Sequence, residues 1–392
     1  MEKQLFQELH IGNRILPGNV ALAPMAGTSD LPFRTICHRQ GASFVCTELV
    51  SARGIRYSGG VLKSYRYLEI EPAVEGPVAI QLFGHDPEDF REAIPLILEH
   101  PVLRGAFSID LNMGCPVNKV VKTGAGSALM TNLPLASSIL TAAVRAAEPY
   151  GVPVTVKFRK GWDDAKKNAV EFARLCLDSG AKAMTLHART RNQMYGGQAD
   201  WACIREVAEA IRGSGVPLFG NGDVVDGKSA VAMLTETGCD GVMVGRAAQG
   251  NPWIFAEIVA ALRWEEKPAA PFDGADNAGP MSCMDKAATL GGADNAGATR
   301  GMDKAATLGT ENKPEPPSPE ERANTIREHL HGLSDKLGER MAVLEMRAQL
   351  AMYFKGQPHA TTFKVAAMSA ETIGEVEALL AEWVRAQTVY LG

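Results

Sequence analysis

One cysteine stands out because of its neighbours along the chain. Cys115 lies between a glycine and a proline, directly after the segment Ile109–Met113. This setting predicts a position in a loop beyond a strand end rather than in the core. Lys119 and Lys122 follow closely, and a loop thiol near cations is able to act as a nucleophile or to deliver one proton. The surrounding sequence carries no accompanying Cys–His–Asn set, so a cysteine protease is not expected.

Cationic side chains recur at alternate positions in two later segments. The first contains Lys157 and Arg159, and the second contains His187, Arg189 and Arg191. Alternate residues of an extended strand point to the same face. Cations gathered on one inward face favour an anionic or electron-rich ligand, because buried like charges are costly without one. A solvated strand end is the alternative interpretation.

One amide and two glycine-containing segments extend this pattern. Gln81 interrupts the apolar run 78–83, and burying an unpaired amide costs about 1–3 kcal/mol. It therefore needs a polar partner, either a ligand or a protein backbone group. Segments 221–223 (Asn-Gly-Asp) and 245–246 (Gly-Arg) each follow an apolar run, an arrangement typical of phosphate sites. No complete G-x-G-x-x-G or P-loop motif occurs, so a Rossmann dinucleotide site is not indicated.

These segments belong to a series of short apolar runs that alternate with helical patterns. The expected strands are Val20–Ala23, Ser43–Cys46, Val78–Phe83, Phe107–Leu111, Val154–Phe158, Ala183–Leu186, Pro217–Phe219 and Gly241–Val244. The expected helices between them are Glu88–His100, Leu135–Ala147, Ala169–Ser179 and Ile204–Arg212. Eight βα units in about 250 residues match an α/β fold of the (β/α)₈ barrel type, whose active site lies at the carboxyl ends of the strands. A doubly wound sheet would produce a similar pattern.

The composition divides the chain into three parts. Residues 1–264 are the expected barrel, and residues 321–392 have helical periodicity at Ala323–Leu337, Arg340–Phe354 and Glu371–Ala386. Between them, residues 265–320 contain an 18-residue unit that occurs twice, at 274–291 and 292–309, with 14 identical positions. Two units with few large apolar side chains cannot build a solenoid. We expect a disordered insertion there; an interaction motif is the alternative.

Charge and cysteine content limit the class of protein. The 392 residues carry a net charge of −5, and residues 265–320, with 5 basic and 10 acidic residues, account for all of it. The acidic balance therefore does not argue against a nucleic-acid partner. No apolar run of about 18 residues suggests a membrane span, and the polar N-terminus lacks the apolar core of a secretory signal. Seven scattered cysteines without C-x-x-C indicate reduced thiols and no metal site. We expect a cytoplasmic protein.

Several motifs together resemble the tRNA-dihydrouridine synthases, most closely their bacterial B-type branch. The motifs are LAPMAGTSDLPFR, QLFG, IDLNMGCP, KVVKTGAGSALM, VKFRKGW, LHARTRNQMYGGQADW, GNGD and MVGRAAQGNPWIF. The resemblance covers about residues 1–260 and 321–360. It implies an FMN-binding (β/α)₈ barrel followed by a helical tRNA-binding domain. The family reduces the C5–C6 double bond of uridines in tRNA, and NADPH recharges the flavin.

The resemblance also implies a role for individual residues. Cys115 would be the general acid that protonates uracil C5 while the flavin N5 hydride passes to C6. The residues implied around FMN are Pro24, Met25, Ala26, Gln81, Lys157, His187, Asn221, Gly222, Asp223, Gly245 and Arg246. Within this set, Gln81 would bond the pyrimidine part of the flavin, and Lys157 would sit near its N1/O2 end. The residues implied at the substrate are Asn112, Arg159, Arg189, Arg191, Arg347 and Lys355. We expect a monomer.

Two other functions fit part of the pattern. A flavin barrel acting on a free pyrimidine would share the cofactor, but that class lacks an appended basic helical domain. A tRNA-binding protein without catalysis would not need Cys115 or the flavin residues.

Overall fold

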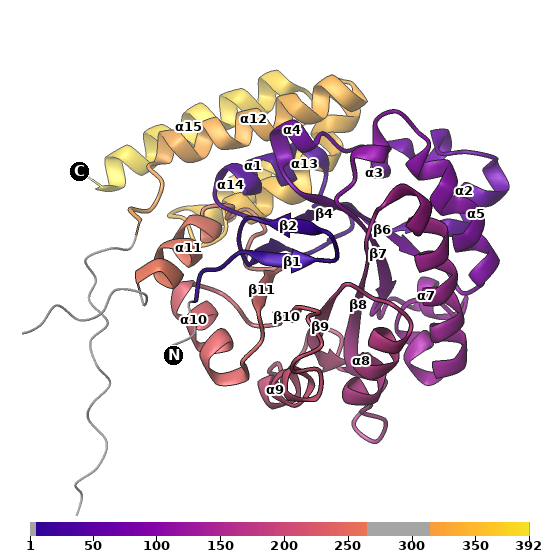
Figure 1. Cartoon of the computed structure of the whole chain (residues 1–392). Coiled ribbons are helices and arrows are strands. Elements are labelled where there is room, and N and C mark those ends of the chain that lie inside the picture. Colours follow the sequence, from indigo (N-terminus) through magenta and orange to yellow (C-terminus); the bar gives the residue numbers. More distant parts are fainter. Residues whose placement is uncertain (1–4, 265–313, 392) are drawn as a thin grey trace, which may run out of the picture.

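Eight parallel strands close into a barrel in the computed structural model, which describes residues 5–264 and 314–391 (Figure 1). They are β3 (Val20–Leu22), β4 (Val45–Cys46), β6 (Val78–Phe83), β7 (Ser108–Met113), β8 (Val154–Gly161), β9 (Ala183–Thr190), β10 (Leu218–Asn221) and β11 (Gly241–Val244). A short β5 (Val50–Ser51) also pairs with β6. Each strand neighbours the next in sequence, and β11 pairs with β3. The Leu22 amide donates to the Phe44 carbonyl at 2.8 Å, which closes the ring. The (β/α)₈ prediction is confirmed, and this circular strand order excludes a doubly wound sheet.

The strands near the site are longer than predicted. Strands β7, β8 and β9 extend two to four residues past their expected ends, into polar residues. Neighbouring parallel strands provide the ladder partners for this extension. A hairpin that we did not predict, β1 (Leu9–Ile11) and β2 (Arg14–Leu16), packs its apolar side chains against Phe44 and Phe219. Because Phe219 lies early in β10, the hairpin covers the end of the barrel opposite the carboxyl ends.

Helices surround the barrel (Figure 1). The longer ones are α1 (Leu31–Arg39), α2 (Ala52–Ser58), α5 (Pro87–Leu98), α7 (Leu133–Ala147), α8 (Ala169–Asp178), α9 (Trp201–Ala210), α10 (Gly227–Thr237) and α11 (Ile254–Trp264). Short turns are α3 (Tyr65–Leu68), α4 (Pro72–Glu75), α6 (Asn118–Val121), η1 (Leu62–Ser64), η2 (Leu103–Gly105), η3 (Gly126–Thr131) and η4 (Glu148–Tyr150). Polar residues start several of them: Asp30, Asp86 and Asn132 each accept a backbone N–H in the first turn. All four predicted barrel helices are present, with ends shifted by at most three residues.

Four C-terminal helices pack together beside α1 (Figure 1). They are α12 (Pro319–Leu337), α13 (Glu339–Tyr353), α14 (Ala360–Ser369) and α15 (Ile373–Leu391). Helix α12 begins four residues before the predicted Ala323, and Ser318 and Glu321 form a capping box at its start. Helix α14 was not predicted. The helices share a core of their own, with fully buried Met346, Leu350 and Trp383.

The sequence prediction of an insertion at 265–320 falls mostly outside the described residues. Among the described helices, none is both long and apolar enough to cross a membrane.

Candidate functional site

A row of polar side chains crosses three adjacent strands. Gln81 on β6 donates from Nε2 to the Asp110 carboxylate at 2.7 Å, and its Oε1 accepts from Asn112 Nδ2 at 2.8 Å. Thr155 on β8 donates to the other Asp110 oxygen at 2.6 Å. The parallel register places Gln81 opposite Asp110 and Asn112 opposite Lys157. Gln81 is fully buried, and its partners are side chains rather than backbone groups.

Asn112 links this row to the cysteine loop. Its Oδ1 accepts from the amides of Cys115 and Gly114, at 2.9 and 3.2 Å. The Cys115 carbonyl accepts from the amide and the hydroxyl of Ser127, at 3.1 and 3.0 Å. The loop at 124–127 thus fixes the cysteine backbone from the far side. Burial raises the pKa of the Cys115 thiol, although the Val117 amide and two nearby cations partly offset this. At neutral pH the group is a protonated thiol.

Lys157 points from β8 toward a second amide. Its Nζ donates to Asn221 Oδ1 at 3.0 Å, and Asn221 Nδ2 donates to the Met243 carbonyl at 2.7 Å. Burial lowers the pKa of Lys157 to about 8, with a further contribution from the Arg159 charge. On β9, which lies between them, His187 pairs in register with both Arg159 and Asn221. Burial, together with surrounding cations, lowers the pKa of His187 well below its usual range, so its ring is neutral.

Asp223 organises the cationic end of the site. Both of its oxygens accept from Arg189 Nη2 at 2.7 Å, and one accepts from Arg246 Nη2 at 3.2 Å. The Ala199 amide also donates to Asp223, at 2.7 Å. The backbone of Asp223 is left-handed, with φ 61°, a conformation that Asp tolerates better than most residues. Burial raises the pKa of this carboxyl, but the bonds from Arg189 and Ala199 and the two guanidinium charges outweigh it, and the net shift is downward.

One buried donor in this region has no partner. The Arg189 side chain is only 1% exposed, and its buried Nη1 atom forms no hydrogen bond. A Cβ at Gly222 would lie 3.4 Å from that atom and 3.3 Å from the His187 ring. The glycine therefore leaves room beside a donor that needs an acceptor. The charges of Lys157, Arg159 and Arg246 also act on His187. The region is therefore cationic, which suits a phosphate. These residues fit a flat, phosphate-bearing cofactor such as a flavin.

The first loop of the barrel lies beside this set. A Cβ at Gly245 would meet the Met25 sulfur at 3.9 Å and Ala23 at 3.6 Å, so the carboxyl ends of β11 and β3 adjoin. Pro24 and Met25 are half-buried and Ala26 is exposed. The loop ends at Gly27, whose amide donates to Glu48 Oε2 at 2.6 Å.

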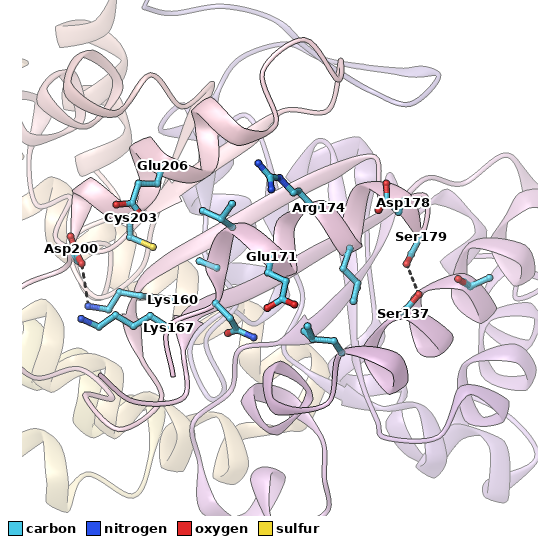
Figure 2. A pocket seen from close by; sticks show the side chains of 16 residues that line it. Ser137, Lys160, Lys167, Glu171, Arg174, Asp178, Ser179, Asp200, Cys203 and Glu206 are labelled. Carbon is cyan, nitrogen blue, oxygen red and sulfur yellow. Dashed lines mark hydrogen bonds and ion pairs between the residues drawn. The ribbon is translucent and has the colours of Figure 1, made fainter. Parts of the chain in front are cut away.

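A separate groove of about 900 Å³ lies outside the barrel, among α7, α8 and α9 (Figure 2). Lys160 reaches Asp200 at 3.4 Å, and Ser137 and Ser179 share a bond of 2.9 Å. Its charges have both signs, and none of the residues predicted for chemistry lines it. The candidate site is therefore the carboxyl end of the barrel.

A sequence model described as dihydrouridine synthase (Dus) matches residues 21–288. The chain belongs to the dihydrouridine synthase family. A protein of Pseudomonas putida named tRNA-dihydrouridine synthase B is 41% identical over 263 residues, 67% of this chain and 74% of the relative. A probable tRNA-dihydrouridine synthase of Mycobacterium tuberculosis is 34% identical over 380 residues, 95% of this chain and 84% of the relative. The predicted membership of the family and its B-type branch are thereby confirmed.

Solved structures agree with the barrel. The histamine dehydrogenase of Rhizobium sp. 4-9 superposes with a TM-score of 0.52 at 13% identity, over 67% of this chain and 48% of that chain. A 2-naphthoyl-CoA reductase gives a TM-score of 0.52 at 9% identity, over 66% of this chain and 52% of that one. At such identities the likeness concerns the fold.

In this dihydrouridine synthase chain, the cations predicted to contact RNA differ in exposure. Arg159 is 2% exposed and donates to the carbonyls of Gly114, Thr190 and Met194, at 2.8–3.0 Å. Arg159 and Arg189 are buried because backbone carbonyls and Asp223 surround them, which places both behind the surface that RNA would reach. Direct RNA contact by these two residues stays a prediction; in the structure both side chains hold loops of the site, through backbone carbonyls and, for Arg189, through Asp223.

The other predicted RNA contacts lie nearer the surface. Arg191 bonds Asn118 Oδ1 at 2.5 Å and stacks over the Trp162 ring at 4.9 Å. Arg347 is half-buried and donates twice to the Ala370 carbonyl, which ties α13 to the end of α14. Lys355 is exposed just beyond α13. Of this set, Lys355 is exposed, and Arg191 and Arg347 are both half-buried.

Sequence reasoning missed three polar residues of the site. Asp110 sits inside the IDLN motif, where a buried acid between apolar residues was the available signal. Glu48 follows the second strand, also a carboxyl end. Tyr195 lies under the guanidinium groups of Arg159 and Arg246, at 5.7 and 5.5 Å from its ring centre. Only the fold brings that loop residue to the site.

Proposed function

We propose that this chain is a tRNA-dihydrouridine synthase that uses FMN and is recharged by NADPH. The observation that carries the proposal is the joining of a protonated Cys115 to an amide row that ends beside Lys157. Membership of the family and the names of the relatives, which specify tRNA, support the substrate. Reduction of the C5–C6 bond of uridine is the reaction that these groups suit.

The barrel residues would hold the flavin through charge and close approach. Arg189, Arg246 and the glycine-containing ends of β10 and β11 would take its phosphate. Gln81 retains one amide hydrogen after donating to Asp110, and Lys157 carries a positive charge at neutral pH. Both groups suit the electron-rich edge of the ring. When bound, the flavin would supply a hydride to uracil C6. Pro24, Met25 and Ala26 would line its edge.

Cys115 would supply the proton. A thiol whose pKa is raised by burial keeps its proton at neutral pH, which an acid requires and a nucleophile does not. Transfer of that proton to C5 balances the hydride gained at C6. Asn112 holds the Cys115 amide and would orient the uracil from the same position.

The target uridine must leave the base stack to reach a site at the end of a barrel. The remaining contacts would come from backbone phosphates and stacking. Arg191 borders the Cys115 loop through Asn118, and Lys355 lies on the helical part at residues 321–392. We propose that this part binds tRNA beside the FMN-binding part at 1–264, and that the protein acts as a cytoplasmic monomer.

The decisive measurement maps dihydrouridine in tRNA from strains with and without the gene. Loss at one or more positions, restored by the wild-type gene and not by Cys115→Ala, supports the proposal. Unchanged dihydrouridine at every position contradicts it. Purified protein should carry flavin; NADPH-dependent turnover of free uracil or orotate without turnover of tRNA would favour the small-pyrimidine alternative. tRNA binding without flavin or turnover would favour the non-catalytic one.

A further inference from the structure

The backbone of Gly27 is held at two successive peptide groups, through its N–H and through its carbonyl. Its amide donates to Glu48 Oε2 at 2.6 Å, and its carbonyl accepts from Gln349 Nε2 at 2.6 Å. Glu48 belongs to the barrel, whereas Gln349 lies on α13, 322 positions after Gly27. Gln349 is 3% exposed, Gly27 is exposed, and the bond between them is partly buried.

Gly27 ends the loop that adjoins the flavin residues. It has a left-handed backbone, with φ 70°, and directly follows Pro24, Met25 and Ala26. The Met25 carbonyl accepts from the amides of Thr28 and Ser29, at 3.0 and 2.9 Å, which makes the loop a compact turn. A rotation of the Gly27–Thr28 peptide group would therefore also move Met25 and Ala26, because hydrogen bonds join these residues in one turn.

The helix that carries Gln349 is itself firmly seated on the barrel. A Cβ at Gly250 would lie 2.2 Å from the Met352 backbone, so the backbones of these two segments touch with no side chain between them. Nearby, buried His329 of α12 is within 3.2 Å of both Asp30 oxygens, and Asp30 caps α1 directly after the loop. The C-terminal helices thus contact Gly27 at the end of the first loop and Asp30 directly before α1.

We infer that Gln349 is a positioning residue: it fixes the Gly27 peptide, and through it the Pro24–Ala26 edge of the flavin site. The inference rests on the proposed function. It makes the C-terminal helices part of the frame of the flavin site, in addition to any contact with tRNA.

The test replaces Gln349 with methionine, which keeps the length of the side chain and removes the donor. The matched control is Gln387→Met, since Gln387 is 2% exposed and donates to the Pro358 carbonyl within the C-terminal helices. FMN affinity is measured by fluorescence titration of the flavin-free protein, and kcat and KM for tRNA are measured at saturating FMN. Gln349→Met should weaken FMN binding by up to about tenfold and lower kcat, as expected for the loss of one partly buried hydrogen bond, with KM for tRNA unchanged. Gln387→Met should leave FMN affinity and kcat as in wild type.

The outcomes separate the inference from the proposed function. FMN affinity and kcat of Gln349→Met within twofold of wild type would overturn the inference. Absence of FMN binding by the wild-type protein would overturn the proposed function instead. Where circular dichroism shows that Gln349→Met does not fold, Gln349→Asn serves, because its shorter amide cannot reach Gly27; wild-type FMN affinity in that variant also overturns the inference.

Discussion

Lys157 Nζ lies 3.0 Å from Asn221 Oδ1, in a bond that spans from β8 to β10 across the intervening strand β9. The partner is a neutral amide, which orients the ammonium group without cancelling its charge. The ammonium charge therefore remains available to a ligand. Burying it costs the flavin-free protein stability, and the same burial lowers the pKa of Lys157 to about 8.

This relationship predicts a pH dependence of stability. Because the pKa of Lys157 is lowered on folding from 10.5 to about 8, the unfolded chain binds more protons between those values, and stability rises with pH there. The free energy of unfolding of the flavin-free wild type should increase relative to that of Lys157→Met, by up to about 1 kcal/mol per pH unit. Below pH 8 the difference should be constant. Urea unfolding of both proteins from pH 6 to pH 10 measures it.

The comparison between the two proteins removes the effect of other groups that titrate at high pH. Lys182→Met, at an exposed position of the barrel, is the control substitution: because it keeps Lys157, its stability should rise relative to that of Lys157→Met as the wild type does. A difference between wild type and Lys157→Met that stays level across pH 8 to 10 would contradict the assignment of a buried charge.

Removal of the Cys115 thiol should abolish the chemistry and spare binding. Cys115→Ala should lower single-turnover reduction of tRNA by about 10²–10⁴-fold, the range for a lost general acid, with FMN and tRNA affinities close to wild type. The control is Cys203→Ala: Cys203 lines the outer groove, and burial likewise raises its pKa, to about 12 (Figure 2). Full activity in Cys115→Ala would remove Cys115 as the acid.

The barrel was predictable because its signals are local. Each βα unit repeats an apolar run and a helical pattern. Once the barrel is predicted, the fold alone brings the strand residues Gln81, Asn112, Lys157, His187 and Asn221 together at the carboxyl end. The register confirms that Asn112 lies beside Lys157 and that His187 lies beside Asn221.

Residues whose role depends on contacts between distant segments were not predictable. The sequence predicts that Arg189 contacts the substrate; its bond to Asp223 is not visible there, because that carboxylate lies 34 positions further along the chain. Gln349 looks like an ordinary polar position of an amphipathic helix. Its partner Gly27 becomes visible only when the C-terminal helices pack on the barrel.

The unpartnered Nη1 of Arg189 predicts an anion effect on the flavin-free protein. Inorganic phosphate at tens of millimolar should raise the melting temperature of the wild type by about 2–4 °C, because it binds only the folded state. Arg189→Lys should lose most of this shift, since a point charge cannot both hold Asp223 and present a second donor. Arg174→Lys, on the outer groove, is the control and should keep the shift. An equal shift in all three proteins would indicate a general salt effect.

The contact at Gly250 predicts how the C-terminal helices affect activity on tRNA. A methyl group at this position would lie 2.2 Å from Met352, and the φ of 65° adds backbone strain. Gly250→Ala should therefore loosen α13 from the barrel, with a loss of about 2–4 kcal/mol, greater proteolysis between the two parts and a higher KM for tRNA. Gly59→Ala is the matched control, because Gly59 has a similar, left-handed φ of 67° and no atom within 4 Å of its added Cβ. It should show only the strain, about 1 kcal/mol. Equal effects of the two substitutions, measured by urea unfolding and limited proteolysis, would mean that strain rather than the close contact dominates.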